Sequence, residues 1–503
     1  MGNVLEIDGH HLTLEDVERV ARWEVTEVRL APAAQGALQT ARRLIEDRVA
    51  RGERVYGVTT GFGRLAEVVI APEQRLALQR NLIRSHAGGI GAALDRGATR
   101  AVMLLRANTL AHGHSGCSPR VVELLLDCLN AGVHPVVPEF GSVGASGDLA
   151  PLAHIALVLT GEGEAEHGGR VVPAAQALHA AHLPTLELRE KDGLSLINGT
   201  QVTTALGVLA LREAERALEA LEVAGALSLE GLRGTPVPFD ADIQGVRPHP
   251  GQATSAARLR ALLEGSEIRE SHRHGDPRLQ DAYSLRCMPQ VHGAARDALS
   301  YVRRVLEIEV NSATDNPLVF PESGQIKSGG NFHAQIVAQA MDFLAIALAD
   351  LGAISERRIE RLLNPDASGL PAFLAHEPGV ESGLMILQVA VSDVLTELRL
   401  LASPASVHSV PTGAGREDHV SMGPAAARKA RRAADALGQI VAVELICAAE
   451  AIEQLRPLQT SPALERFHAV IREQVPRLSG DRALAADVQH IGALVRAGTF
   501  RAM

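Results

Sequence analysis

Apolar residues recur at helical spacing along the first part of the chain. In the segments 76–83, 100–110 and 121–129 they stand three or four positions apart, which predicts amphipathic helices. Earlier in the chain, Thr13 and Asp16 have the spacing of a capping box. This spacing predicts that a helix begins after Thr13 and continues to residue 21.

Short apolar runs beside turn residues predict a few strands among these helices. The run 4–7 is followed by Asp-Gly and fits a strand that enters a tight turn. Small hairpins are expected around residues 168–169 and 322–324, where glycine marks the turns. The segment 134–140 cannot be helical throughout, because two prolines interrupt it.

After residue 198 the pattern is overwhelmingly helical. The segments 202–229, 333–363 and 384–401 each predict a long apolar helix, and such helices favour a central bundle. We therefore expect a mainly α fold, with a mixed helical part that carries small hairpins over residues 1–200 and a bundle over residues 201–503. The sequence has no obvious linker, so the two parts are expected to form one cooperative unit.

Composition narrows the classes of function. The formal net charge of −10 over 503 residues argues against a nucleic-acid-binding protein. Four scattered cysteines, without a Cys-x-x-Cys pair, fit a reducing cytoplasm better than a disulfide framework or a zinc site. The chain does not open on a signal-peptide pattern, and charges such as Asp342 and Asp350 interrupt its apolar helices. We therefore expect a cytoplasmic protein without a membrane span.

The first chemical candidate is the run of small residues at 141–148. Its glycines do not match the dinucleotide-binding motif, and a flexible loop is the simplest interpretation. The tripeptide Ala145-Ser146-Gly147 allows another interpretation, because the unhindered nitrogen of Gly147 can attack the Ala145 carbonyl and close a five-membered ring. Loss of water, including the serine hydroxyl, would leave 4-methylideneimidazole-5-one (MIO), an electrophile that ordinary side chains do not provide.

This tripeptide lies in a segment, 144–154, that resembles the signature of the aromatic amino acid ammonia-lyases. Further blocks match the same family in the same order, so the resemblance covers essentially the whole chain; they are 56–63, 196–201, 280–286, 330–333 and 417–423. The resemblance implies a helical fold of the fumarase/aspartase-like superfamily and an MIO group built from Ala145, Ser146 and Gly147. It also implies a homotetramer with shared active sites, and neither a metal nor a diffusible cofactor.

The resemblance also assigns roles to residues whose simplest interpretation is structural. Tyr56, on a glycine-rich loop, would be the base that removes the β-proton, although most tyrosines pack in a core. Tyr283 would lie beside the electrophile and assist in handling the substrate and ammonia. Asn198, which could equally be a turn residue before Gly199, would donate a hydrogen bond to the carbonyl of the prosthetic ring.

Three further residues would bind the substrate according to the same resemblance. Arg286 would hold the α-carboxylate, since a guanidinium can bind a carboxylate through two hydrogen bonds, although most arginines form structural ion pairs. Gln280 would lie near that carboxylate, and Phe332, otherwise a core residue, would form a wall of the site.

Two features point to the substrate ring. Ser85 and His86 occupy the position that distinguishes substrates within the family, and this pair resembles the one in the histidine-specific branch. His86 can form a hydrogen bond with an imidazole nitrogen. Glu417 is likewise typical of that branch, whereas the phenylalanine and tyrosine enzymes carry glutamine there. The expected reaction is therefore elimination of ammonia from L-histidine to give trans-urocanate.

Some positions depart from the pattern of this branch, namely Thr59, Met288 and Arg416. Arg416 stands directly before Glu417, and a cation there can change the charge of that carboxylate. The departures therefore bear on substrate affinity and pH optimum more than on the identity of the substrate. The alternatives are a tyrosine or phenylalanine ammonia-lyase or aminomutase on the same scaffold, and a non-catalytic relative. The second predicts damage at Tyr56, Ser146, Tyr283 or Arg286, and all four are intact.

Overall fold

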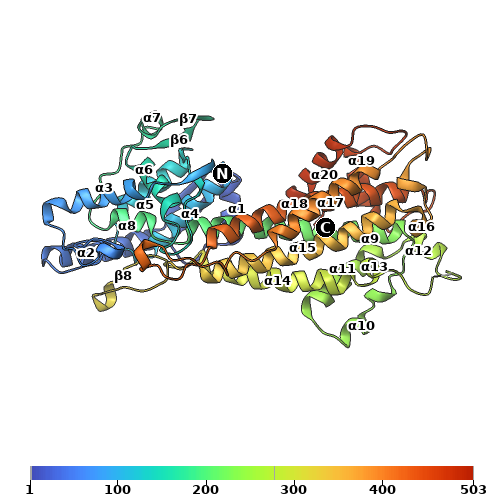
Figure 1. Cartoon of the computed structure of the whole chain (residues 1–503), viewed down its shortest axis with the longest axis horizontal. Helices are drawn as coiled ribbons and strands as arrows, with labels where there is room; N and C mark the ends of the chain where they lie inside the picture. Colours follow the sequence, from blue (N-terminus) through green and yellow to red (C-terminus); the bar gives the residue numbers. More distant parts are fainter. Residues whose placement is uncertain (1–2, 277, 502–503) are drawn as a thin grey trace. The chain divides into compact units, whose positions relative to one another are not determined.

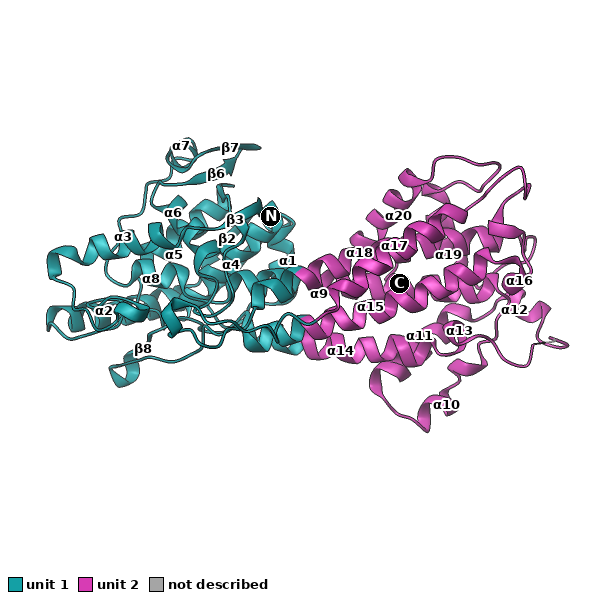
Figure 2. Ribbon diagram, viewed as in Figure 1, with its two compact units in different colours: residues 1–209, 304–341, 404–428 teal, residues 210–303, 342–403, 429–503 magenta. Residues whose placement is uncertain are grey.

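The computed structural model describes residues 3–276 and 278–501, and its chain forms two compact units (Figures 1 and 2). Unit 1 contains residues 1–209, 304–341 and 404–428, and unit 2 contains residues 210–303, 342–403 and 429–503. The sequence suggested a contiguous division at residue 200. The units differ from that division because two later segments, 304–341 and 404–428, pack with the N-terminal part. The sequence could not predict this, since the periodicity of a segment does not show where it packs.

Eight helices precede residue 200 in unit 1. The capping box is confirmed, because the Thr13 side chain accepts a hydrogen bond from the amide of Asp16 at the start of the first helix. The three helices predicted between residues 76 and 129 are also present. The bounds are α1 (Leu14–Ala21), α2 (Pro32–Ala50), α3 (Arg75–His86), α4 (Arg96–Ala111), α5 (Pro119–Asn130), α6 (Leu149–Leu159), α7 (Ala174–Ala180) and α8 (Asp192–Ile197).

Short strands form small sheets in the same unit. Both predicted hairpins are confirmed, as β6 (Glu164–His167) with β7 (Arg170–Pro173), and β8 (Leu318–Phe320) with β9 (Gln325–Lys327). The predicted first strand, β1 (Val4–Ile7), pairs in parallel with β2 (Glu27–Leu30) across α1. The proline-broken segment supplies β4 (His134–Pro135), which pairs with β6, and β5 (Pro138–Phe140), which pairs with β3 (Ile90–Ala93).

Long helices dominate the rest of the chain, which confirms the mainly α prediction. Predicted helices 202–229 and 384–401 correspond to α9 and α17, and α15 begins two residues later than expected. The bounds are α9 (Gln201–Gly231), α10 (Ala241–Gly245), α11 (Pro250–Leu263), α12 (Glu267–Ser271), α13 (Tyr283–Arg286), α14 (Met288–Glu309), α15 (Gln335–Leu363), α16 (Pro365–Ser368), α17 (Met385–Leu401), α18 (Gly423–Glu453), α19 (Pro462–Gln474) and α20 (Ala485–Ala497).

A buried carboxylate ties three of these helices together within unit 2. Glu444 of α18 accepts hydrogen bonds from Arg358 and Ser355 of α15 and from Ser228 of α9. The Arg358 and Glu444 side chains are fully buried, so their charges compensate each other where water cannot reach. This network fixes the register of α9, α15 and α18.

Two helical stretches are long and apolar enough to qualify as membrane spans by length and composition. They are residues 192–231, whose most apolar window is entirely buried in the structure, and α15, whose window is 56% buried. Asp342 and Asp350 were expected to interrupt α15 as a membrane span, and an 18-residue window within α15 nevertheless meets this criterion of length and composition.

Candidate active site

A cavity of about 560 Å³ lies in unit 1, and all of its lining residues belong to that unit. It brings together seven residues that the sequence analysis selected: Tyr56, Ser85, His86, Ser146, Asn198, Phe332 and Glu417. They come from six separate stretches of the chain, so only the folded unit assembles them.

Gly147 can be replaced by no other residue without strain, because its backbone lies directly against Gly199. Its φ is +76°, and a Cβ atom built on it would lie 2.4 Å from the Gly199 nitrogen. The next amide, of Asp148, donates a 2.7 Å hydrogen bond to the Gly199 carbonyl. The Ala145-Ser146-Gly147 tripeptide is therefore held tightly against the chain that follows α8.

Asp148 anchors the same loop to the start of α9. Its buried carboxylate accepts hydrogen bonds from the Thr203 amide at 2.8 Å, the Thr203 hydroxyl at 3.0 Å and the Ser142 hydroxyl at 3.2 Å. Burial raises the pKa of Asp148 to about 6, while these hydrogen bonds act in the opposite direction. The carboxylate thus fixes both ends of the 142–148 segment.

Glu417 meets the centre of this tripeptide. The Ser146 hydroxyl donates a 2.6 Å hydrogen bond to Oε1 of Glu417, and the Thr412 hydroxyl donates to Oε2. Backbone hydrogen bonds between Thr412 and Glu417 close the intervening turn, which contains the 3₁₀ segment η6 (Gly413–Gly415). Glu417 is therefore oriented at both oxygens.

Asn198 presents its amide in a defined orientation. Its Nδ2 donates a 3.0 Å hydrogen bond to the backbone carbonyl of Asn316, which can only accept, so the amide nitrogen must lie on that side. Its Oδ1 is buried and has no hydrogen-bond partner among the described residues. From the sequence, Asn198 was expected only as a donor. In the structure its Nδ2 already donates to Asn316, and its Oδ1 acceptor is unpaired among the described residues.

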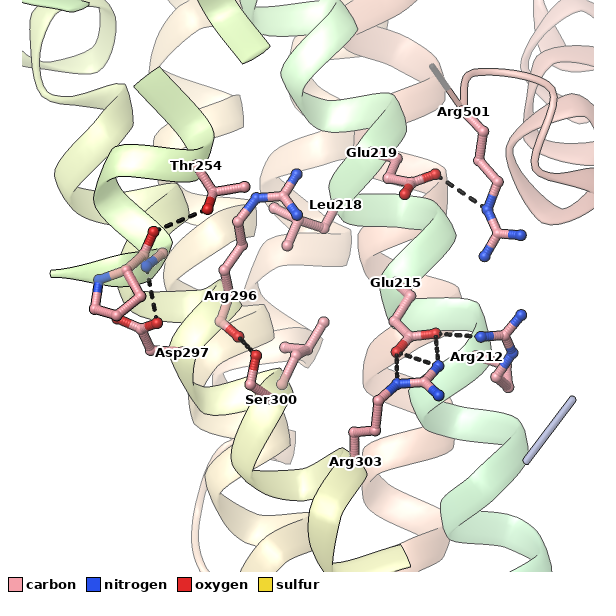
Figure 3. A pocket seen from close by; sticks show the side chains of 13 residues that line it. Arg212, Glu215, Leu218, Glu219, Thr254, Arg296, Asp297, Ser300, Arg303 and Arg501 are labelled. Carbon is pink, nitrogen blue, oxygen red and sulfur yellow. Dashed lines mark hydrogen bonds and ion pairs between the residues drawn. The ribbon is translucent and has the colours of Figure 1, made fainter. Parts of the chain in front are cut away.

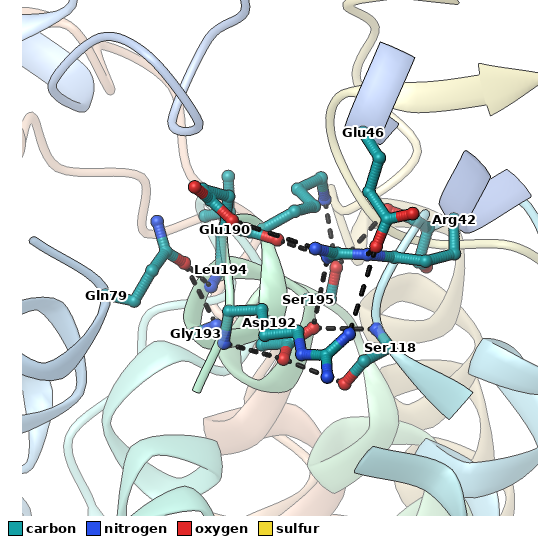
Figure 4. A network of polar contacts seen from close by, with 12 residues as sticks. Arg42, Glu46, Gln79, Ser118, Glu190, Asp192, Gly193, Leu194 and Ser195 are labelled. Atoms are coloured by element: carbon teal, nitrogen blue, oxygen red, sulfur yellow. Dashed lines mark hydrogen bonds and ion pairs between the residues drawn. The ribbon is translucent and has the colours of Figure 1, made fainter. Parts of the chain in front are cut away.

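A buried polar network fixes the helix that ends directly before Asn198 (Figure 4). Asp192, the first residue of α8, accepts from the amide and the hydroxyl of Ser118 at 2.7 and 2.8 Å. Arg42 donates to the Glu190 carbonyl at 2.7 Å and lies 3.8 Å from the Asp192 carboxylate. Burial raises the pKa of Asp192. The sequence did not predict this support, because its members lie far apart in the chain.

His86 lies at the end of α3 with one ring nitrogen engaged. Nδ1 lies 2.8 Å from the Leu82 carbonyl and 3.1 Å from the Ser85 hydroxyl. Because a carbonyl only accepts, this contact places the proton of a neutral His86 on Nδ1 and leaves a lone pair on Nε2. His86 can therefore accept a hydrogen bond from a ligand in the cavity.

Tyr56 lies on a loop that is fastened at several points. Its phenolic oxygen accepts a 3.0 Å hydrogen bond from the Gly63 amide. The Gln79 side chain donates to the Gly57 carbonyl and accepts from the Gly193 amide, so it joins this loop to α8. Thr59 donates to the Glu53 carbonyl and accepts from the Val55 amide, which makes it a support of the loop.

Outside the tripeptide, three selected residues are not among the lining of this cavity. Gln280, Tyr283 and Arg286 belong to unit 2, at and before the short helix α13. The Arg286 guanidinium stacks 4.6 Å from the centre of the Tyr283 ring, and Tyr283 is 70% exposed. The cavity contains instead residues that the sequence analysis did not select for the site, among them Arg64, Asn81 and Asn316. Arg64 directly follows a family block, and Asn81 stands four positions before Ser85, and this proximity was the available signal.

Another cavity, of about 380 Å³, lies within unit 2 and is rich in arginine (Figure 3). Arg212 and Arg303 both bind the Glu215 carboxylate, at 2.6 and 2.9 Å, and Arg501 binds Glu219 at 3.1 Å. These carboxylates compensate the arginine charges, so we find no reason to place the chemistry there.

The comparisons with known proteins agree with this geometry. A model of the aromatic amino acid lyase family matches residues 12–473 of the chain. The chain belongs to the aromatic amino acid lyase family. This confirms the family that the six sequence blocks indicated.

Individual aromatic amino acid lyases and aminomutases are similar over the full length. The histidine ammonia-lyase of Anaeromyxobacter sp. (strain K) is 52% identical, with 98% of this chain and 99% of that protein covered. The crystal structure of histidine ammonia-lyase from Trypanosoma cruzi has a TM-score of 0.92 and 40% identity, covering 99% of this chain and 94% of that one. Tyrosine aminomutase from Streptomyces globisporus has the same TM-score and identity, with 99% and 97% covered.

Proposed function

We propose that this aromatic amino acid lyase eliminates ammonia from L-histidine and releases trans-urocanate. The observation that carries the proposal is the proximity of Glu417 to position 146 in a cavity that also contains His86; the hydrogen bond between Ser146 and Glu417 belongs to the tripeptide before its hydroxyl is lost. The similarity to proteins named histidine ammonia-lyase supports it. A solved tyrosine aminomutase is equally similar in fold, so the choice of substrate rests on the side chains that would meet its ring.

The tripeptide fits the internal cofactor that the family resemblance implies. Gly147 is in the left-handed region, and a Cβ atom on it would clash with Gly199, so only glycine, with its unhindered amide nitrogen, fits at the position that ring closure uses. Asn198, whose buried Oδ1 has no hydrogen-bond partner among the described residues, lines the same cavity. An MIO group formed from Ala145, Ser146 and Gly147 would supply an electrophile that activates the substrate amine for departure.

The imidazole ring of the substrate would lie between His86 and Glu417. A neutral imidazole has one N–H, and either the Nε2 lone pair of His86 or the Glu417 carboxylate can accept it. A phenyl or phenol ring offers no N–H group to either acceptor. Phe332 supplies an apolar surface beside them.

Tyr56 would remove the β-proton of the substrate. The Gly63 amide donates to its phenolic oxygen and so orients it, and a general base must lie within hydrogen-bond reach of the proton that it removes. The loop around it is held by Gln79 and Thr59, so the oxygen has a fixed position in the cavity wall.

A second copy of the chain would complete the site in a homotetramer. Gln280, Tyr283 and Arg286, which the family resemblance assigns to the substrate carboxylate and amine, do not line the cavity of their own chain. Leu279 is 96% exposed and Tyr283 70% exposed, although large apolar and aromatic side chains gain free energy when they are covered. Contact with another subunit would cover them and bring Arg286 to a neighbouring cavity.

A cytoplasmic location is part of the same proposal. The four cysteines are free thiols, and Cys117, Cys128 and Cys447 are buried. Burial raises the pKa of Cys117 and of Cys128 to about 12, which keeps both thiols protonated and unreactive. Unpaired thiols are ordinary in a reducing compartment.

The proposal is tested by the absorbance of the products when the purified protein is mixed with L-histidine, L-tyrosine or L-phenylalanine. Fast formation of urocanate from L-histidine alone is expected. Product from tyrosine or phenylalanine would support the elimination reaction and overturn the assignment of L-histidine as the substrate. If no amino acid reacts, the intact mass distinguishes a tripeptide that has not lost two waters from a mature protein that is not an ammonia-lyase.

A further inference from the structure

Two arginines line the cavity from turns that are distant in the sequence. Arg64 belongs to η1 (Gly63–Leu65) and Arg416 directly follows η6, and these two turns pack next to each other in unit 1. Both arginines are exposed residues of the cavity lining. Within residues 3–276 and 278–501, the side chain of neither arginine has a hydrogen bond or an ion pair.

These two arginine side chains are unpaired among the described residues, whereas the other charged side chains compared here have partners. Glu417, the acidic residue of the lining, already accepts from Ser146 and Thr412. In the arginine-rich cavity of unit 2, Arg212 and Arg303 share the Glu215 carboxylate. A guanidinium without a carboxylate partner can bind an incoming anion without first losing another contact.

We propose that Arg64 and Arg416 form an anion subsite that binds the carboxylate of the product. The inference rests on the proposed function, because that reaction changes the charge of the ligand. The zwitterion of L-histidine has a net charge of zero. When the Cβ–H bond breaks, its electrons form the Cα–Cβ double bond, and the Cα–N electrons leave with nitrogen. The nitrogen departs as ammonium after taking up the abstracted proton, and urocanate remains with a net charge of −1.

Two cations at the cavity therefore favour the product over the substrate. They attract the carboxylate of both ligands, but they repel the ammonium group that only the substrate carries. At a separation of about 7 Å in a partly solvated site, each arginine should change the affinity for the carboxylate by about 3-fold, and the pair by about 10-fold. The site should therefore retain urocanate, and urocanate should inhibit the enzyme.

The test uses two unreactive probes that differ only in the carboxylate, 3-(imidazol-4-yl)propionate and 4-ethylimidazole. Their dissociation constants are measured by calorimetry on the full-length protein, and the ratio of the two isolates the carboxylate contribution. The variants are Arg64→Gln, Arg416→Gln and the double variant. Arg51→Gln, at an exposed arginine outside the cavity lining, is the matched control, and Arg286→Gln reports the carboxylate contact that the family resemblance implies.

We expect the ratio to fall by about 3-fold in each single variant and about 10-fold in the double variant, with no change in Arg51→Gln. The inhibition constant of urocanate should rise in parallel, while KM for L-histidine changes less. A ratio in the double variant that equals the wild-type ratio, with loss only in Arg286→Gln, would overturn the subsite. The probes bind without turnover, so an active enzyme with an unchanged ratio rejects the subsite alone, whereas a protein that binds neither probe rejects the histidine assignment with it.

Discussion

The hydroxyl of Ser146 donates a 2.6 Å hydrogen bond to the carboxylate of Glu417, a residue 271 positions later in the chain. The contact joins the tripeptide proposed to become the electrophile with the side chain proposed to select an imidazole. The turn that carries Glu417 is closed by hydrogen bonds with Thr412, so the carboxylate is oriented before a substrate arrives.

Replacement of Glu417 by glutamine should therefore disable catalysis without unfolding unit 1. We expect kcat/KM for L-histidine to fall by about 10²-fold or more in Glu417→Gln, because a neutral amide is a poor proton acceptor. Steady-state kinetics and intact mass together separate lost chemistry from lost maturation. Glu187→Gln, at an exposed glutamate away from the cavity, is the control, and equal activities in the two variants would contradict a role for Glu417.

Gly147 and Gly169 offer a matched pair for testing the packing of the tripeptide. Their φ angles are +76° and +78°, but a Cβ atom on Gly147 would meet Gly199 at 2.4 Å, whereas one on Gly169 has open space within 4 Å. In both alanine variants, the positive φ at the substituted residue should destabilise the protein by about 1 kcal/mol. Only Gly147→Ala should also lose the two-water mass change and the activity. If Gly147→Ala matures normally, the close contact is not required.

Tyr56→Phe tests the proposed base. Removal of the phenolic oxygen should lower kcat by about 10²- to 10⁴-fold with a smaller effect on KM, since the oxygen would act on the proton and not on the bound ground state. Tyr301→Phe, whose ring lies 5.9 Å from that of Phe343 in a separate part of the chain, should leave kcat unchanged. A kcat for Tyr56→Phe near the wild-type value would assign the base to another residue.

The buried ion pair of Lys191 and Asp315 should matter more for stability than any surface pair. Their 2.6 Å contact has both side chains fully buried, and Asp315 also accepts from Ser195 of α8. Lys191→Met leaves the carboxylate uncompensated, which should lower the free energy of unfolding by about 3–5 kcal/mol. Arg29→Met, in an exposed pair with Glu27, should leave the midpoint of urea unfolding unchanged. Equal midpoints for the two variants would show that Asp315 finds another partner.

His134 predicts a pH dependence of stability. Burial, and then the nearby Arg100 guanidinium, lowers its pKa from 6.5 to about 4. The unfolded chain therefore binds the proton first, so this contribution is complete above pH 6.5 and is lost as the pH falls toward 4. The loss should be on the order of 2 kcal/mol. Urea midpoints measured between pH 4.5 and 7.5 should fall more steeply for the wild type than for His134→Gln. The exposed His179→Gln should follow the wild type.

The sequence by itself determined the elements and the type of chemistry. The helical periodicity predicted α9 and α17 nearly to their ends, and the capping box predicted the start of α1, because both signals depend on residues within a few positions of each other. The glycine turns predicted both hairpins for the same reason. The order of the six blocks identified the family, and with it the candidate residues in the cavity.

Only the tertiary structure decided how distant residues meet. It brought Gly147 against Gly199, oriented the Asn198 amide by means of the Asn316 carbonyl, and left Arg64 and Arg416 unpaired in one cavity. It also assigned Tyr283 and Arg286 to unit 2, whereas the lining residues of the cavity belong to unit 1. Periodicity records which face of a segment is buried, but not against what. The partner is chosen by side-chain shape and hydrogen bonding across the whole folded unit, which no short stretch of sequence contains.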